Sequence, residues 1–169
     1  LALIEGVPRV MGLAEILQHF IDFRHGIVVR RTEFELREAE ARAHILEGLK
    51  VALDNIDDVI VIIRGSKDPI QAKEGLMNGF DLSEIQSQAI LDMRLQRLTG
   101  LEVDKVVTEY KEVIKIISKL KGVLGSKAQR MDIIKQELLE IRNQFGDERR
   151  TEIVAVVTDF SMEDMIAEE

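Results

Sequence analysis

Apolar residues recur in the second half of the chain with the seven-residue period of a coiled coil. One series of positions runs from Val103 to Phe145 in steps of seven, and a second, offset by three, runs from Val106 to Ile141. Sustained apolar heptads are typical of a helix packed along a partner helix. The pattern therefore predicts a long helix over residues 103–145.

An interruption of this helix is expected near residues 122–126. Gly122 and Gly125 each cost about 1 kcal/mol relative to Ala inside a helix. Ser126 is a residue type that caps the start of a helix, and Lys127 occupies a position that is otherwise apolar in its series. We therefore predict that these four residues form a hinge.

A second long helix is predicted over residues 27–63, where apolar residues alternate in steps of three and four. The alternation slips between Leu46 and Leu49, where one step of three follows another. Such a slip overwinds a coiled coil locally. If the two helices pair antiparallel with Val29 opposite Phe145, the slip lies level with the predicted break. This coincidence favours that antiparallel register and a bend in the middle of the rod.

The residues between the long helices, 64–102, are predicted to form a small helical tip. Asp68-Pro69 is typical of a helix start. Ser83 and Gln86 make a capping box for a second helix, which is expected to close at Thr99-Gly100.

This second tip helix is apolar on more than one face, which predicts self-association. Ile85, Ala89 and Met93 form one stripe, and Leu91, Leu95 and Leu98 form another. A unit this small cannot bury both stripes on itself. We therefore expect a homodimer through the tip, and the expected interface residues are Gln88, Ile90, Leu91, Arg94, Leu95, Leu98, Thr99 and Leu101.

The two ends of the chain have short β patterns. Residues 1–12 read as a hairpin whose strands flank the turn-rich residues 5–8, and a helix follows up to an interruption at Gly26. Residues 146–169 read as a helix stop, a strand over 151–157 and an acidic linker toward a C-terminal domain. Because the chain opens with Leu1 and not with Met, we expect it to be a piece of a longer protein.

Composition agrees with a mainly α fold: a long antiparallel coiled coil with a small helical tip. The 169 residues are 46% hydrophobic but only 4% aromatic, carry a net charge of -8, and include no Cys. The missing cysteines exclude disulfides and thiolate metal sites, and no apolar run is long enough to span a bilayer. The acidic balance argues against a free-standing nucleic-acid binder. We expect a cytoplasmic protein without a membrane partner.

Candidate catalytic chemistry is weak in this sequence. Tyr110 falls in the apolar heptad series, which favours packing over a nucleophilic role. His19, His25 and His44 show no metal-ligand spacing, and the glycines form no phosphate-binding loop. We therefore expect no catalytic, cofactor-binding or metal-binding residue in this chain.

A group of arginines is expected to converge at one end of the rod, because the antiparallel register brings residues 24 and 150 level. Two interpretations stay open: the group contacts DNA phosphates, or it pairs with neighbouring carboxylates such as Glu33 and Glu148. The candidate DNA-contacting residues are Arg24, Arg30, Arg31, Arg149 and Arg150, with Arg142 close by in the same register.

Three groups of residues form long runs of a familiar kind: 30–37 with 42–49 and 52–57, then 88–102, and finally 145–153. They closely resemble, in that order, the descending coiled-coil helix, the dimer-gate helix and the return of the ascending helix in the A subunit of bacterial DNA gyrase. The A subunit of topoisomerase IV is a close alternative. The resemblance implies that residues 1–26 are the edge of the tower, 27–63 and 103–145 the coiled coil, and 64–102 the exit gate.

The resemblance also implies the activity of the parent protein, which is ATP-dependent passage of one DNA duplex through a double-strand break in another. The catalytic tyrosine of the family has no counterpart in this sequence, so we expect the fragment to be inactive. Mg2+ and ATP are expected to be used by regions or a protein chain other than this one. The implied partners are a second copy, the B subunit of gyrase and double-stranded DNA. A purely structural coiled-coil dimeriser, such as the hinge of a chromosome-organising protein, stays open as the alternative.

Overall fold

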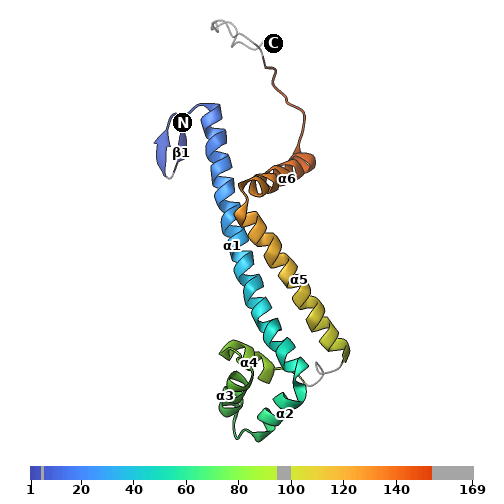
Figure 1. Ribbon diagram of the computed structural model, residues 1–169. Helices are drawn as coiled ribbons and strands as arrows, with labels where there is room; N and C mark the ends of the chain where they lie inside the picture. The colour runs from blue at the N-terminus through green and yellow to red at the C-terminus, as the bar shows by residue number, and fades with distance from the viewer. Residues whose placement is uncertain (5, 95–99, 154–169) are drawn as a thin grey trace, which may run out of the picture. The chain divides into compact units, whose positions relative to one another are not determined.

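The computed structural model is mainly helical, with a short antiparallel sheet near the N-terminus (Figure 1). It describes residues 1–4, 6–94 and 100–153, except for the side chain of Leu101. The chain divides into two compact units, Leu1–Lys135 and Gln136–Glu169. The elements are β1 (Ala2–Ile4), β2 (Val7–Arg9), α1 (Leu13–Asp54), α2 (Ile56–Gly65), α3 (Pro69–Phe80), α4 (Glu84–Leu91), α5 (Gly100–Gly125) and α6 (Lys127–Phe145).

The N-terminal hairpin is present with a tighter turn than the sequence predicts. β1 and β2 pair antiparallel, with Ala2 opposite Arg9 and Ile4 opposite Val7. Gly6 has a φ of 82° in the turn, a conformation that glycine adopts without steric cost. At the other end of the chain, residues 151–153 are not in a strand, and the rest of the predicted strand lies outside the described residues.

Helix α1 corrects the predicted boundaries at both of its ends. It runs without interruption through Gly26, where the glycine penalty of about 1 kcal/mol is offset by burial such as that of nearby Val28. The predicted helix over 27–63 breaks at Asn55, which has φ -127° and ψ 38°. The Asn55 amide donates to the carbonyl of Val51 at 2.9 Å, and the break lets α2 turn into the tip.

The tip helix is shorter than predicted. Helix α4 ends at Leu91, and the Asp92 main-chain N–H donates back to the Gln88 carbonyl at 3.0 Å. Gly100 was expected to close this helix, but it is the first residue of α5. A glycine can end one helix or begin the next, so residue type alone does not decide between the two.

The rod consists of α1 and α5, which run antiparallel side by side (Figure 1). Their register differs from the predicted one. Arg42 pairs with Glu109 at 2.5 Å, and Glu40 pairs with Lys121 at 2.8 Å, whereas the predicted register places Arg42 opposite Asp132. The prediction treated 103–145 as one helix aligned on Phe145, but α5 ends at Gly125, so the contacts with the tip set the register instead.

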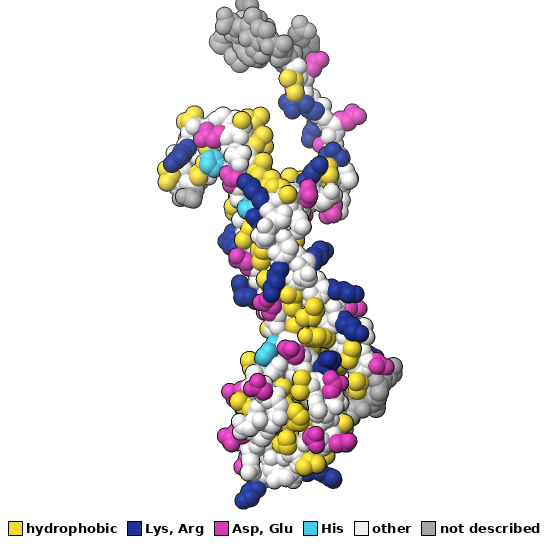
Figure 2. All heavy atoms as spheres, viewed as in Figure 1, with side chains coloured by type: hydrophobic (Ala, Val, Ile, Leu, Met, Phe, Trp, Pro, Cys, Tyr) yellow, Lys and Arg dark blue, Asp and Glu magenta, His cyan; other side chains and the backbone are white. Residues whose placement is uncertain are grey.

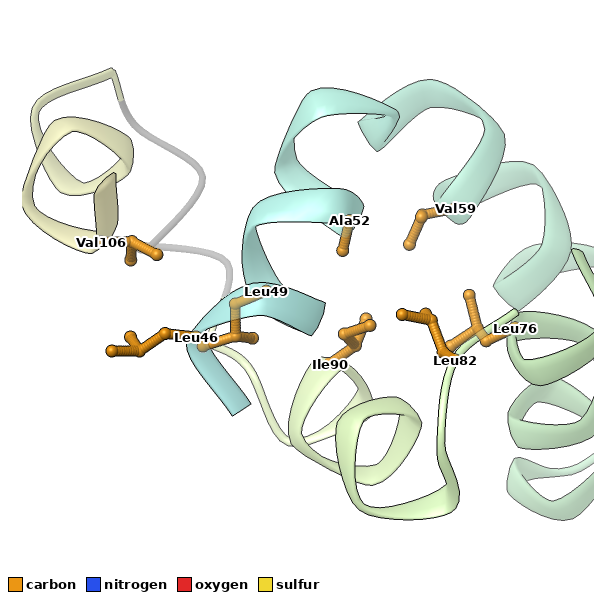
Figure 3. Packing of buried hydrophobic residues seen from close by; sticks show 8 residues of the cluster. All are labelled: Leu46, Leu49, Ala52, Val59, Leu76, Leu82, Ile90 and Val106. Carbon is orange, nitrogen blue, oxygen red and sulfur yellow. The ribbon is translucent and has the colours of Figure 1, made fainter. Parts of the chain in front are cut away.

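The core of the tip explains the slip in the apolar pattern of α1. Leu46 and Leu49 are buried, and they pack in one cluster with Ile90 from α4 and Val106 from α5 (Figure 3). At this level α1 therefore meets two helices instead of one, and it needs apolar residues on two faces. The slip reflects this double contact and not an overwound coiled coil. The cluster comprises Leu46, Leu49, Ala52, Val59, Leu76, Leu82, Ile90 and Val106.

Candidate functional site

Local capping interactions define the two tip helices α3 and α4. The Asp68 carboxylate accepts from the Gln71 N–H at 2.8 Å, and Pro69 occupies the first helical position. The predicted capping box is confirmed: the Gln86 N–H donates to Ser83 Oγ at 3.2 Å, and the Ser83 N–H donates to Gln86 Oε1 at 2.9 Å. These contacts satisfy main-chain donors that a helix start leaves without partners.

The predicted interface residues divide into buried, exposed and undescribed positions. Ile90 is 3% exposed and packs inside the tip, so its assignment to the interface is wrong: it faces α1 within its own chain. Leu91 is half-buried against the same core, while Gln88 and Arg94 are exposed. Outside the described residues or side chains lie Leu95, Leu98, Thr99 and Leu101.

The other predicted stripe is only partly outward. On α4, Ile85 is 63% exposed and Ala89 is half-buried, whereas Met93 follows the end of the helix and packs against the tip core. Hydrophobic side chains lie over the tip among acidic ones (Figure 2). No sequence signal singled out Ile45 of α1, because its place beside Ala89 depends on how α4 packs onto α1.

Two hollows flank this face of α4 and share Ile45, Ala89 and Asp92. Their volumes are ≈ 540 Å³ and ≈ 400 Å³. Both are lined by apolar and charged side chains together, such as Ile45 and Leu49 with Arg42 and Glu102 in the larger one. Mixed apolar and charged surfaces of this kind occur in protein–protein contacts.

The break between α5 and α6 lies at Ser126, inside the stretch where the sequence predicts it. Ser126 is outside both helices, and its Oγ accepts from the Gln129 N–H at 3.4 Å at the start of α6. A Cβ at Gly125 would meet no atom within 4 Å, and one at Gly122 would lie 3.6 Å from the Gln129 amide oxygen. Steric crowding therefore does not require either glycine.

Arg130 reaches back across this break. Its guanidinium donates to the carbonyl oxygens of Val123, at 3.0 Å, and of Leu124, and to His25 Nε2 at 2.9 Å. The break therefore lies at the level of His25, and the predicted coincidence with the slip between Leu46 and Leu49 is wrong. No sequence signal singled out Arg130, because its partners lie in two other helices.

The predicted convergence of the arginines depended on the register that the structure corrects. Arg24, Arg30 and Arg31 lie on α1, and the Arg30 Nε donates to the Gly26 carbonyl at 3.5 Å. Arg149 and Arg150 belong to the second unit, where Arg149 Nε donates to the Thr151 carbonyl at 2.9 Å. The observed register therefore gives no reason to expect these arginines in a single patch.

Among the described residues of the tip, an ion pair between Lys73 and Glu84 shifts the pKa of the carboxyl group. Lys73 Nζ lies 2.8 Å from Glu84 Oε1, and this hydrogen bond and charge lower the pKa of Glu84 below its ordinary value. Among the residues that the structure describes, no cluster of His, Asp and Glu could hold a metal ion. Within the same residues, no helix has the length and hydrophobicity needed to cross a membrane.

Comparison with known proteins places the chain among topoisomerase subunits. The family model for the A subunit of DNA gyrase/topoisomerase IV matches residues 1–139. The DNA gyrase A subunit of Clostridium acetobutylicum is 54% identical over 169 residues, which are 100% of this chain and 20% of the relative.

The same protein name recurs among other relatives. The DNA gyrase A subunit of Halalkalibacterium halodurans is 54% identical over 98% of this chain and 20% of its own length. Its counterpart in Helicobacter pylori strain J99 is 48% identical over 100% of this chain and 20% of its own length. The chain thus spans about a fifth of the length of these relatives. It belongs to the family of DNA gyrase and topoisomerase IV A subunits.

Proposed function

We propose that this chain is the rod and exit gate of a type II topoisomerase A subunit. In this role two tips hold the cleaved complex together and separate to release the transported duplex. The observation that carries the proposal is the family match over residues 1–139, joined to an apolar face of α4 that the tip leaves partly open. Family membership favours this role over a hinge of a chromosome-organising protein.

The rod supports the proposal through its length. Helix α1 has 42 residues, which span about 63 Å at 1.5 Å per residue. Such a rod keeps a gate well away from the site of DNA cleavage and leaves room for a duplex between them. A long helix with a helical partner resists bending more than a loop of equal length.

The gate itself is proposed to be a symmetric contact between identical surfaces. In a two-fold dimer the same patch serves both partners, so one patch on each tip is sufficient. The proposed contact comprises the exposed residues Gln88 and Arg94, the half-buried Leu91, and the predicted residues Leu95, Leu98, Thr99 and Leu101.

The helix break is proposed to be the hinge of the gate. Ser126 lies outside both helices, and Gly122, Gly125 and Lys127 lie in the adjoining turns. A short non-helical segment between rigid helices can absorb an angular change without melting either one. Separation of the tips would therefore change the angle between α5 and α6 at this point.

DNA, the gyrase B subunit, ATP and Mg2+ belong to the proposal for the whole protein. The described residues do not fit a bound Mg2+, because no acidic cluster is present among them, so no step through a metal is assigned to this chain. Arg24, Arg30, Arg31, Arg149 and Arg150 are proposed as phosphate contacts. Their support is charge alone, and with a net charge of -8 the isolated chain should bind duplex DNA weakly.

Sedimentation of the 169-residue chain tests the gate. We expect a dimer, and a monomer when Leu95→Glu and Leu98→Glu are combined, because buried charges without partners are costly. The matched control combines Val61→Glu with Ile70→Glu, at side chains that are 68% and 67% exposed on α2 and α3, and should stay dimeric. A dimer in both variants would place the contact elsewhere, and a monomeric wild type would refute the dimer gate.

A further inference from the structure

Three lysines form a line along one side of helix α5. Lys111, Lys115 and Lys119 follow one another at intervals of four residues, and all three are exposed. Residues four apart are neighbours on the surface of a helix, so the three side chains share one side over about 12 Å at 1.5 Å per residue. These three residues are called the lysine stripe below.

The stripe lies on the side of α5 that faces away from α1. Val113 is two residues from both Lys111 and Lys115, which places it on the opposite side of a helix with 3.6 residues per turn. There Val113 packs against the core cluster that contains Leu46 and Leu49 of α1. Lys and Arg side chains are visible along the α5 side of the rod (Figure 2). The stripe is therefore open to a partner from outside the rod.

Other lysines of the rod have acidic partners, whereas those of the stripe have none among the described residues. Lys121 lies 2.8 Å from Glu40, and Lys105 lies 2.5 Å from Glu102. The stripe forms no ion pair with any described carboxylate, although Glu112 is exposed on the same helix. Like charges four residues apart destabilise a helix. The stripe thus lowers the stability of α5 until an anion binds to it.

The helix dipole does not account for these lysines. Basic residues interact favourably with the dipole within the last turn of a helix, but Lys119 lies six residues before Gly125, where α5 ends. The acidic residues of α5 are confined to residues 100–112, and residues 113–127 contain four lysines and no acidic residue. In a chain with a net charge of -8, this segment creates a local positive potential that attracts anions.

We propose that the lysine stripe binds the phosphate backbone of duplex DNA. A duplex carries one negative charge per about 1.7 Å of its axis, so its charge density complements three cations within about 12 Å of helix. Lysine contacts phosphate as a point charge, and such contacts position DNA without reading its sequence. The proposal rests on the proposed function for the choice of DNA as the anion. It adds a DNA contact on the rod, separate from the proposed arginine contacts.

Fluorescence anisotropy of a short labelled DNA duplex with the 169-residue chain tests the stripe. At about 50 mM salt, where phosphate contacts are strong, we expect weak binding by the wild type. The combined variant Lys111→Gln, Lys115→Gln and Lys119→Gln should bind roughly tenfold more weakly, and the slope of log K against log salt should fall by about 2–3. Glutamine forms helices about as well as lysine, so α5 should stay folded.

A matched control removes the same charge elsewhere. Lys50, Lys67 and Lys135 are exposed outside α5, and their combined replacement by Gln gives the same net charge as the stripe variant. This control should change affinity by less than about twofold and keep the wild-type salt slope. Equal losses in the two triple variants would show that net charge alone governs binding and would overturn the proposal. A wild type that does not bind the duplex at about 50 mM salt would also overturn it.

Sedimentation of the same proteins separates DNA from a second copy as the partner. The stripe variant should keep the oligomeric state of the wild type. A dimeric wild type with a monomeric stripe variant would show that the lysines contact another copy of the chain, and the proposal would be wrong. A monomeric wild type would refute the dimer gate and leave the DNA measurement as the test of the stripe.

Discussion

Arg130 Nε donates to His25 Nε2 across 2.9 Å, although the two residues are 105 positions apart. A guanidinium has only donors, and the same group also donates to the last carbonyls of α5. One side chain at the start of α6 therefore joins three helices at the break. A break held in this way has a defined resting geometry and can still open when these contacts are lost.

Arg130→Met should loosen the break while keeping most of the apolar stem. We expect a loss of about 1 kcal/mol in the free energy of unfolding and faster amide exchange in the first turn of α6, because the carbonyls at the end of α5 lose a charged donor. Urea denaturation and exchange measure the two effects. Arg142→Met is the control: Arg142 is exposed on α6 and bonds to its neighbour Asn143, so its loss should change neither.

Gly122→Ala combined with Gly125→Ala should stiffen the break. Neither added Cβ meets a close contact, so the helix should gain about 1–2 kcal/mol from propensity alone, seen as a higher midpoint in thermal unfolding. In the whole enzyme the proposed hinge predicts slower strand passage with DNA cleavage intact. Unchanged passage in a stiffened enzyme would remove the hinge from the mechanism.

Gly48→Leu should undock α4 from the rod. The new side chain would start 2.6 Å from the side chain of Gln86, and overpacking of this kind costs about 1–3 kcal/mol. Gly26→Leu is the matched control in the same helix, because a Cβ there meets nothing within 4 Å and leucine is the better helix former. Urea denaturation should therefore show a lower midpoint for Gly48→Leu and a higher midpoint for Gly26→Leu. Equal losses of stability in the two variants would contradict the close approach of Gln86 to Gly48.

Acid should weaken the contact between Lys73 and Glu84. The pKa of Glu84 is lowered below 4.5 by its hydrogen bond and charge interaction with Lys73. Its contribution to stability is therefore present above the unfolded-state pKa and is lost as pH falls through the lowered folded-state value. Glu84→Gln should unfold at a lower urea concentration than wild type at neutral pH, and the difference should vanish in acid. A difference that persists at low pH would have another origin.

Local sequence patterns predicted the elements that depend on near neighbours. The capping box of Ser83 and Gln86 follows from residue types three positions apart. The break at Ser126 follows from two glycines and a capping serine in succession. Seam positions such as Val106 follow from the heptad period, because a helix that pairs along its length with one partner buries the face set by that spacing.

The register and the contacts between helices required the tertiary structure. The pairing of Arg42 with Glu109 cannot be read from a heptad pattern, because sliding one regular helix along another by a heptad preserves every apolar match. The sequence predicted Ile90 at the dimer interface, but in the structure Ile90 is buried in one cluster with Leu46 and Leu49 of α1.

The sequence by itself determined the family, the helical class, the caps at Asp68 and Ser83 and the break at Ser126, since each depends on residues close together in the chain. Tertiary structure decided what those elements touch. Arg130 meets His25, and Gln86 meets His44, only because the fold brings distant segments within hydrogen-bonding distance. Such contacts depend on the angle and offset between packed helices, and these are set by side-chain shape across the whole interface.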